Sequence, residues 1–424
     1  MPEHRGAPVA RGADGYRLGV GETQGLPGTG RVRLLIGAVL VNVCLGSLFA
    51  WSLFVDPLGR EFATSSAALS GVFSLAVATF AVVVLVSGRL VDRSPPRRTI
   101  LVAAASALAG MLTAASATSL LTVAAGYGLL FGVGNGLGYS TAVAAAGKAF
   151  TRRRGSAVGV AVAAYAGGPL VASPAISALL TAYGWRVTFV VLGLAIGALL
   201  ALGGVLLGAQ GRPVGADTGA PHDGTHLRLL ARPGGLIGGA FLLGTLPALM
   251  VVAHAATIAA EAGMDAATTT AAVALLGAGN LTGRAGGGWI SDRIGRLPGL
   301  RAAAGALAVT CAVLPEVAGS GALLVALVLV GIGYGTQSAL VPSLVADLFG
   351  PQRFAANFGR VFLGWGVAGL LGPQAGAWLS DTAGGFAMAL RVGAASALAA
   401  LVLYALIARP DPRARTDTPS ASRA

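Results

Sequence analysis

Long intervals without a charged side chain constrain this sequence more than any other feature. Residues 34–55 and 62–88 contain no Asp, Glu, Lys or Arg, and neither does the much longer interval 99–147. One helix needs about 20 apolar residues to cross a bilayer, so the third interval has room for two helices with a turn near residues 117–119. Charged residues make up only 11% of the chain, against about 25% in ordinary soluble domains. The sequence therefore predicts an integral membrane protein and excludes a soluble enzyme or a nucleic-acid-binding domain.

The rest of the chain shows the same alternation of apolar intervals and charged loops. This pattern predicts an all-α membrane protein of twelve transmembrane helices in two six-helix halves. The further apolar intervals, some extended past a single charge, are 155–185, 187–211, 233–260, 266–283, 302–315, 317–346, 361–380 and 382–408. The expected organisation is a disordered cytoplasmic tail (1–32), an N-terminal half (33–211), a cytoplasmic linker (212–232), a C-terminal half (233–408) and a second cytoplasmic tail (409–424). The first tail lacks the apolar core of a signal peptide.

The distribution of Lys and Arg predicts that both termini lie in the cytoplasm. The expected location of the protein is the inner membrane of a bacterium-like cell. In this orientation the loops expected outside contain only Arg60, Arg186 and Arg391. The inner loops contain Arg93, Arg97, Arg98, Lys148, Arg152, Arg153, Arg154, Arg212, Arg228, Arg232, Arg293, Arg296 and Arg301. The net charge of +13 therefore reflects membrane topology.

Two short segments repeat at corresponding places in the two halves. Gly88-Arg-Leu-Val-Asp92-Arg93 ends the second predicted span, and Gly288-Trp-Ile-Ser-Asp292-Arg293 ends the eighth, 200 positions later. Such a duplication is typical of two halves related by an axis along the membrane normal. The glycine would admit a neighbouring helix, the Asp would accept hydrogen bonds from a helix N-terminus, and the Arg would pair with the other half. We therefore predict gating roles for these six residues, with simple helix capping as the alternative.

Twelve spans, a central polar loop and this repeated segment resemble the major facilitator superfamily. More narrowly, Phe49-Ala-Trp-Ser-Leu-Phe-Val-Asp-Pro-Leu58, the segment from Gly279 to Arg296 and Asn357-Phe-Gly359 resemble the oxalate–formate antiporter and monocarboxylate-transporter branch. The resemblance implies a secondary active transporter that moves a small organic anion by alternating access, through proton symport or anion exchange. Because the sequence contains no H-E-x-x-H motif, cysteine pair or carboxylate pair, we expect no enzymatic activity, cofactor or metal. The expected protein is a monomer, with the substrate, protons and the lipid bilayer as partners.

Arg284 is the strongest candidate for substrate binding. It lies eight residues before Asp292, about 12 Å from the inner loop at 1.5 Å per residue. An arginine at this depth is costly and indicates function, although snorkelling to the inner surface is the alternative. In the resembled branch an arginine at this place binds the substrate carboxylate. A lysine expected there in the eleventh span is replaced here by Trp365, which favours a monocarboxylate over a dianion.

Other residues that carry polar groups within the spans are predicted to line the substrate cavity together with Arg284. His254 lies in the middle of the seventh span, where it either carries a coupled proton, lines the pocket or forms a neutral structural hydrogen bond. Aromatic candidates are Trp51, Tyr139, Tyr165 and Tyr334, with interfacial or packing roles as the alternative. Asn280 and Gln337 are further polar candidates.

Two other functions are alternatives to this prediction. An exporter of drugs or metabolites remains open, although cationic drugs would favour a mid-span carboxylate that the sequence lacks. A transporter-like membrane sensor or a membrane enzyme is disfavoured, because the polar tails are too short for an output domain and titratable groups do not cluster. The sequence contains no phosphate-binding loop for ATP.

Overall fold

The computed structural model describes residues 28–150, 154–208, 234–316, 319–349 and 354–407, which are helical almost throughout and contain no strand. The helices of the N-terminal half are α1 (Gly28–Gly46), η1 (Ser47–Ala50), α2 (Ser52–Phe62), α3 (Ser66–Arg93), α4 (Pro96–Ala115), α5 (Leu120–Val123), η2 (Ala124–Phe131), α6 (Gly132–Ala149), α7 (Arg154–Ala166) and α8 (Gly168–Leu207). Those of the C-terminal half are α9 (Gly234–Glu261), α10 (Ala266–Ile294), α11 (Arg296–Val313), η4 (Leu314–Glu316), α12 (Ser320–Phe349), α13 (Phe354–Ala383) and α14 (Ala387–Leu406).

The number of membrane spans depends on how three stretches are counted. Among the described residues, nine stretches are long and apolar enough to cross a membrane, and one of them, Ala157–Leu207, is 51 residues long. Gly184 interrupts this stretch with non-helical dihedral angles (φ 75°, ψ 175°) and divides it into two helices. α10 and α13 fall outside the nine, since glycines and polar residues such as Arg284 and Gln374 lower their hydropathy. The all-helical fold is confirmed, and the count of twelve remains a prediction that includes these helices.

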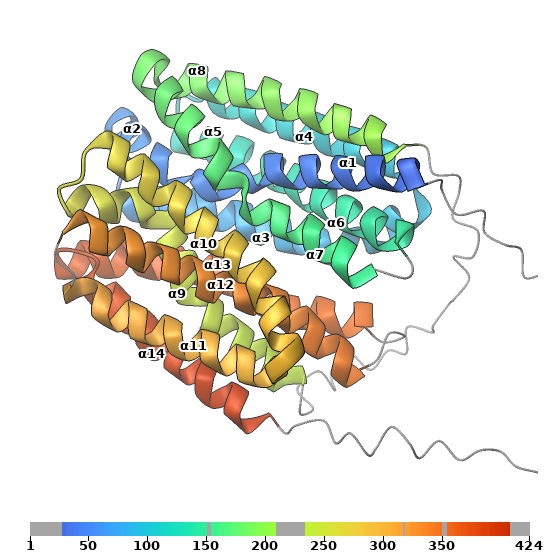
Figure 1. Cartoon of the computed structure of the whole chain (residues 1–424). Helices are drawn as coiled ribbons and strands as arrows, with labels where there is room; N and C mark the ends of the chain where they lie inside the picture. Colours follow the sequence, from blue (N-terminus) through green and yellow to red (C-terminus); the bar gives the residue numbers. More distant parts are fainter. Residues whose placement is uncertain (1–27, 151–153, 209–233, 317–318, 350–353, 408–424) are drawn as a thin grey trace, which may run out of the picture.

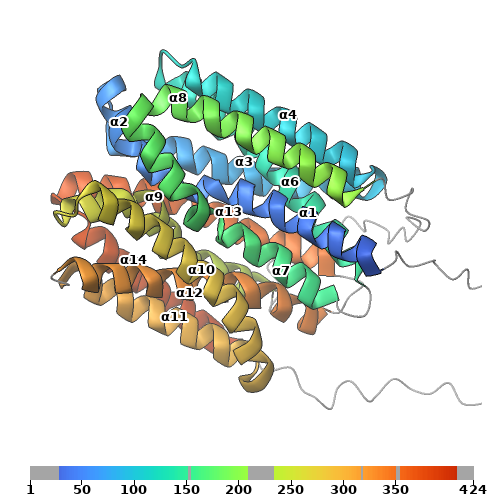
Figure 2. The ribbon, with the colours of Figure 1, turned by 45° about the horizontal axis from the view of Figure 1, so that its top comes forward.

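The two halves lie side by side as two helix bundles (Figures 1 and 2), with α1–α8 in one and α9–α14 in the other. Contacts between them join α3 to α13, α7 and α8 to α10, and α2 to α9. The seam between the bundles therefore involves the second and eleventh predicted spans on one side and the fifth and eighth on the other.

The helices α3 and α10 show the duplication most directly. They begin at residues 66 and 266, and each is capped by the preceding side chain: Ser65 accepts a hydrogen bond from the Ala68 N–H, and Asp265 accepts one from the Thr268 N–H at 2.8 Å. Hydrogen bonding by the Thr268 side chain, together with this backbone bond, lowers the pKa of the Asp265 carboxyl. The chain thus builds the same helix twice, in the register that the 200-residue repeat predicts.

Small residues allow α10 to pack closely on α12. A Cβ added at Gly279, Gly283 or Gly287 would collide with the α12 backbone or side chain near Val328, Ile332 and Thr336, respectively. Because these glycines recur every four residues, they form one stripe along α10. Arg284, one position beyond Gly283, consequently faces a different direction and reaches Val162 of the N-terminal half.

All three arginines predicted to lie outside are paired with a carboxylate. Arg60 binds Asp56 at 2.7 Å, Arg186 binds Glu61 at 2.8 Å, and Arg391 binds Glu316 at 2.9 Å. These pairs cancel the positive charge at that end of the molecule. The orientation is set by Lys and Arg rather than by net charge, so these pairs do not test it and it stays a prediction.

Candidate functional site

Arg284 lies half-buried at the seam between the two halves. Its Nε donates a hydrogen bond to Asn280 Oδ1 at 3.1 Å, and its Nη1 donates one to the backbone carbonyl of Val162 in α7 at 3.2 Å. Both partners are neutral, and no carboxylate among the described side chains forms an ion pair with it. Much of the guanidinium's donor capacity is left unused, because an arginine offers five N–H groups. The side chain is held in place from two helices while its positive charge stays uncompensated.

Six aromatic residues, which we call the aromatic cluster, surround this part of the seam. They are Phe49, Phe80, Tyr139, Tyr165, Tyr334 and Trp365. Tyr139 and Tyr165 meet edge to face at 5.5 Å, and Phe80 meets Trp365 across the two halves at 5.4 Å. Trp365 Nε1 donates a hydrogen bond to the Tyr334 hydroxyl at 2.8 Å. The three tyrosines are also close enough to Arg284 for its charge to act on their hydroxyls.

Two buried amides adjoin the cluster, and each has one unpaired end. Asn280 Oδ1 accepts from Arg284, and Asn135 Oδ1 accepts from the Tyr165 hydroxyl at 2.7 Å. The Nδ2 atom of each has no hydrogen-bond partner, although the two side chains are at most 1% exposed. An unpaired buried donor costs about 1–3 kcal/mol. The arrangement is therefore suited to a ligand that brings acceptor oxygens.

The predicted candidates divide between this cluster and other places. Arg284, Tyr139, Tyr165 and Tyr334 are brought together. Trp51 lies apart, in a packed group of the N-terminal half where its ring is 4.5 Å from that of Tyr127. Gln337 is buried inside the C-terminal half, where its Nε2 donates to the Gly244 carbonyl at 3.1 Å.

His254 also lies away from the cluster and joins the two halves. Its Nδ1 lies 2.8 Å from the Met250 carbonyl, which can only accept, and its Nε2 lies 2.7 Å from Ser70 Oγ in α3. Nδ1 therefore carries a proton, and in the neutral ring Nε2 accepts from Ser70. This geometry fits the structural alternative for His254, and proton coupling stays a prediction.

The predicted gating segments are only partly described. The side chains of Asp92, Arg93 and Asp292 lie outside the described residues. A Cβ added at Gly88 or Gly288 would meet no described atom within 4 Å, so none of the described helices packs against either glycine in this conformation. The Arg293 guanidinium lies 3.4 Å over the ring of Trp289, on its own helix. The gating roles stay predictions.

Some members of the site carried no clear signal in the sequence. In the sequence, Phe49 is one residue of a longer matching stretch, Phe80 and Asn135 have no distinguishing pattern, and Trp365 stands out only as the absence of a cation. Phe80 is one apolar residue among many, and its position in an apolar helix does not distinguish it.

Comparison with known proteins places the chain in a family. The sequence matches the Major Facilitator Superfamily over residues 35–320 and 235–424. It is 28% identical to the oxalate:formate antiporter of Oxalobacter formigenes, covering 86% of this chain and 88% of that protein. It is 29% identical to monocarboxylate transporter 11 of Mus musculus, covering 85% of this chain and 83% of that protein.

Solved structures agree on the fold. A crystal structure of a D-xylose-proton symporter superposes with a TM-score of 0.68 at 17% identity, covering 89% of this chain and 98% of that one. The relatives named here are transporters rather than enzymes. The chain therefore belongs to the Major Facilitator Superfamily, whose members are multi-pass membrane transporters.

Proposed function

We propose that this protein is a secondary active transporter that carries a small monocarboxylate across the inner membrane, acting as a monomer with both termini in the cytoplasm. The observation that carries the proposal is Arg284: a cation at the seam of the two halves with two neutral partners. The names of the relatives, an oxalate:formate antiporter and a monocarboxylate transporter, support the same class of substrate.

The charge at Arg284 favours an anion. Two unit charges 4 Å apart attract by about 4 kcal/mol at an effective dielectric constant of 20, and a guanidinium matches a carboxylate in a bidentate geometry. A neutral or cationic substrate would leave Arg284 uncompensated. The drug-exporter alternative is less well supported, because a cationic compound would meet this charge without an acidic partner.

The surroundings of Arg284 favour a small anion with a single carboxylate. The aromatic cluster supplies rings on several sides, and Trp365, whose single N–H donates to the Tyr334 hydroxyl, adds no second cation. A monocarboxylate would neutralise the site, whereas a dianion would leave one negative charge among aromatic rings. The free Nδ2 groups of Asn135 and Asn280 offer further donors.

The hydrogen bonds between the halves suit an alternating-access cycle. Two of them lie toward the predicted outer end: Ser70 with His254 at 2.7 Å, and Thr270 with Ser177 at 2.7 Å. Ser70 and Thr270 are 200 positions apart, so each copy of the repeat contributes one hydroxyl. We infer that these bonds hold the outer face closed and break when the halves rock.

The test is a transport screen with the purified protein in proteoliposomes. Labelled formate, acetate, lactate, pyruvate and oxalate are offered to empty vesicles, to vesicles preloaded with unlabelled anion, and across a pH gradient. We expect uptake of at least one monocarboxylate and little of oxalate. Stimulation by preloading identifies exchange, and stimulation by the pH gradient identifies proton symport. Uptake of none of these anions by a folded protein would contradict the proposal.

A further inference from the structure

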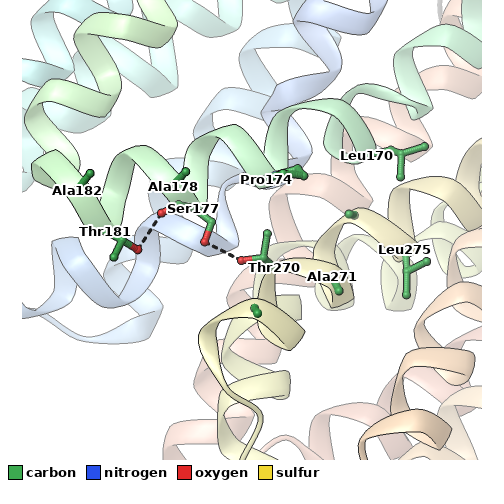
Figure 3. A pocket seen from close by; sticks show the side chains of 11 residues that line it. Leu170, Pro174, Ser177, Ala178, Thr181, Ala182, Thr270, Ala271 and Leu275 are labelled. Atoms are coloured by element: carbon green, nitrogen blue, oxygen red, sulfur yellow. Dashed lines mark hydrogen bonds between the residues drawn. The ribbon is translucent and has the colours of Figure 1, made fainter.

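A groove runs along the seam between the two halves, away from Arg284. It is lined by residues of α8 and α10 and has a volume of about 770 Å³, within the range of about 300–1,000 Å³ typical of small-molecule sites. The residues of α8 are Leu170, Pro174, Ser177, Ala178, Thr181 and Ala182, and those of α10 are Ala267, Thr270, Ala271, Ala274 and Leu275. Figure 3 shows the two helices with these side chains, among which Ser177 and Thr270 face each other across the seam.

The shape of the groove follows from its residues. Near Pro169 the helices touch, since a Cβ added at Gly277 would lie 3.0 Å from Pro169 Cβ. From there toward the predicted outer end, alanines face each other and leave space. Pro174 and Ala178 are exposed on the α8 side. Thr270 and Leu275 lie about 6 and 14 Å from the start of α10, at 1.5 Å per residue, so the groove opens sideways at the depth of the outer leaflet.

The polar groups of the groove need no ligand. The Thr270 and Ser177 hydroxyls are hydrogen-bonded to each other at 2.7 Å, and Thr270 is also 2.8 Å from the Ala266 carbonyl. The Thr181 hydroxyl donates to the Ser177 carbonyl at 2.9 Å (Figure 3). No charged side chain lines the groove. A charged or strongly polar occupant would therefore lose its hydration without gaining a partner, whereas a hydrocarbon chain would lose nothing.

We propose that this groove binds an acyl chain of an outer-leaflet phospholipid. The bilayer supplies such chains at this depth. An alkyl chain fits the groove because the lining is apolar and its polar groups are already hydrogen-bonded. One wall comes from each half of the molecule, so the bound chain contacts both. Binding itself does not depend on the proposed function.

A consequence for transport does rest on the proposed function. If the outer ends of α8 and α10 separate during the cycle, the groove exists only while the outer face is closed. A chain bound there then stabilises that conformation, since a ligand favours the state that binds it.

The test uses a phospholipid with a photoactivatable diazirine near the middle of its acyl chain, reconstituted with the full-length protein. After irradiation, labelled peptides are quantified by mass spectrometry. We expect labelling enriched on residues 170–182 and 267–275. Ala178→Phe and Ala271→Phe fill the groove and should each reduce this labelling at least about fivefold. Val191→Phe is the matched control: Val191 lies on α8 at a similar depth, is exposed and is outside the groove, and its replacement should leave the labelling unchanged.

Three outcomes would overturn the proposal. The first is labelling of the groove no stronger than that around Val191. The second is labelling that persists in both filled variants although each elutes as a folded, monodisperse protein. The third is loss of an oligomer in the filled variants, which would assign the groove to a second copy of the chain. None of these readouts requires transport, so failure of this proposal and failure of the monocarboxylate proposal are distinguishable.

Discussion

Trp365 is the residue that we expect to set the preference of the site for monocarboxylates over dianions. The resemblance to the oxalate–formate antiporters led us to expect a lysine here, and this chain has an indole that donates to Tyr334 at 2.8 Å. Trp365→Lys would add a second cation beside Arg284, so we expect the ratio of oxalate to formate transport to rise about tenfold or more, equivalent to about 1.4 kcal/mol. Trp365→Phe keeps a ring without the N–H and should not shift the ratio. An unchanged ratio in an active Trp365→Lys protein would refute the role assigned to this position.

Asn280 is the second residue whose role can be isolated. Its Oδ1 holds Arg284 Nε at 3.1 Å, and replacement by Asp would put a carboxylate there at almost the same size. The new carboxylate would form an ion pair with the guanidinium and compete with the substrate for it. The apparent KM for a monocarboxylate should therefore rise at least about tenfold. Asn280→Ser, which stays neutral, should raise it less. Initial rates of uptake in proteoliposomes measure both, and equal KM values for Asn280→Asp and wild type would contradict the charge argument.

At the scale of the helix, the glycine stripe of α10 determines how α10 packs on α12 and therefore where Arg284 lies. A side chain at Gly283 would collide with the Ile332 backbone of α12, and forcing extra atoms into a packed contact costs about 1–3 kcal/mol. We expect Gly283→Leu to lower the thermal midpoint of the purified protein by several degrees. Gly286→Leu is the control, because an added Cβ there meets no atom within 4 Å. Equal midpoints for the two variants would show that α10 and α12 do not pack in this register.

At the scale of the whole molecule, the two halves must separate on one face for transport to occur. Ser177 and Thr270 face each other across the seam with hydroxyls 2.7 Å apart, so Ser177→Cys combined with Thr270→Cys should form a disulfide on oxidation. The native Cys44 and Cys311 are both buried and should not interfere. We predict that oxidation abolishes transport and that a reductant restores it, whereas each single variant is insensitive. Full transport by the verified disulfide form would contradict opening at this seam.

The fold could be predicted from the sequence because membrane insertion leaves a one-dimensional signal. Charge-free intervals located the helices, and the turn predicted at residues 117–119 falls between α4 and α5. Details set by packing were not accessible. The first helix begins at Gly28 rather than near residue 33, and it is interrupted at η1, where Gly46 packs against the backbone of Tyr165 and Gly168.

The site could be predicted in part, for a related reason. Arg284 stands out because a charge within an apolar span needs an explanation. Nothing in the sequence distinguishes the environment of Phe49 from that of Trp51. In the structure, however, Phe49 contacts Tyr165 and Tyr334, whereas Trp51 packs inside the N-terminal half. When every face of a helix is apolar, the pattern no longer indicates which face is turned to the site.

The most direct test of the account is the effect of Arg284 on anion transport. Arg284→Ala removes the cation that two neutral partners hold at the seam, and Arg391→Ala is the control, since it removes an exposed arginine paired with Glu316. Uptake of the monocarboxylate identified in the screen is measured for both in proteoliposomes, after insertion and folding are verified. The account predicts that Arg284→Ala loses transport while Arg391→Ala retains it. Uptake by Arg284→Ala with unchanged apparent affinity would contradict it.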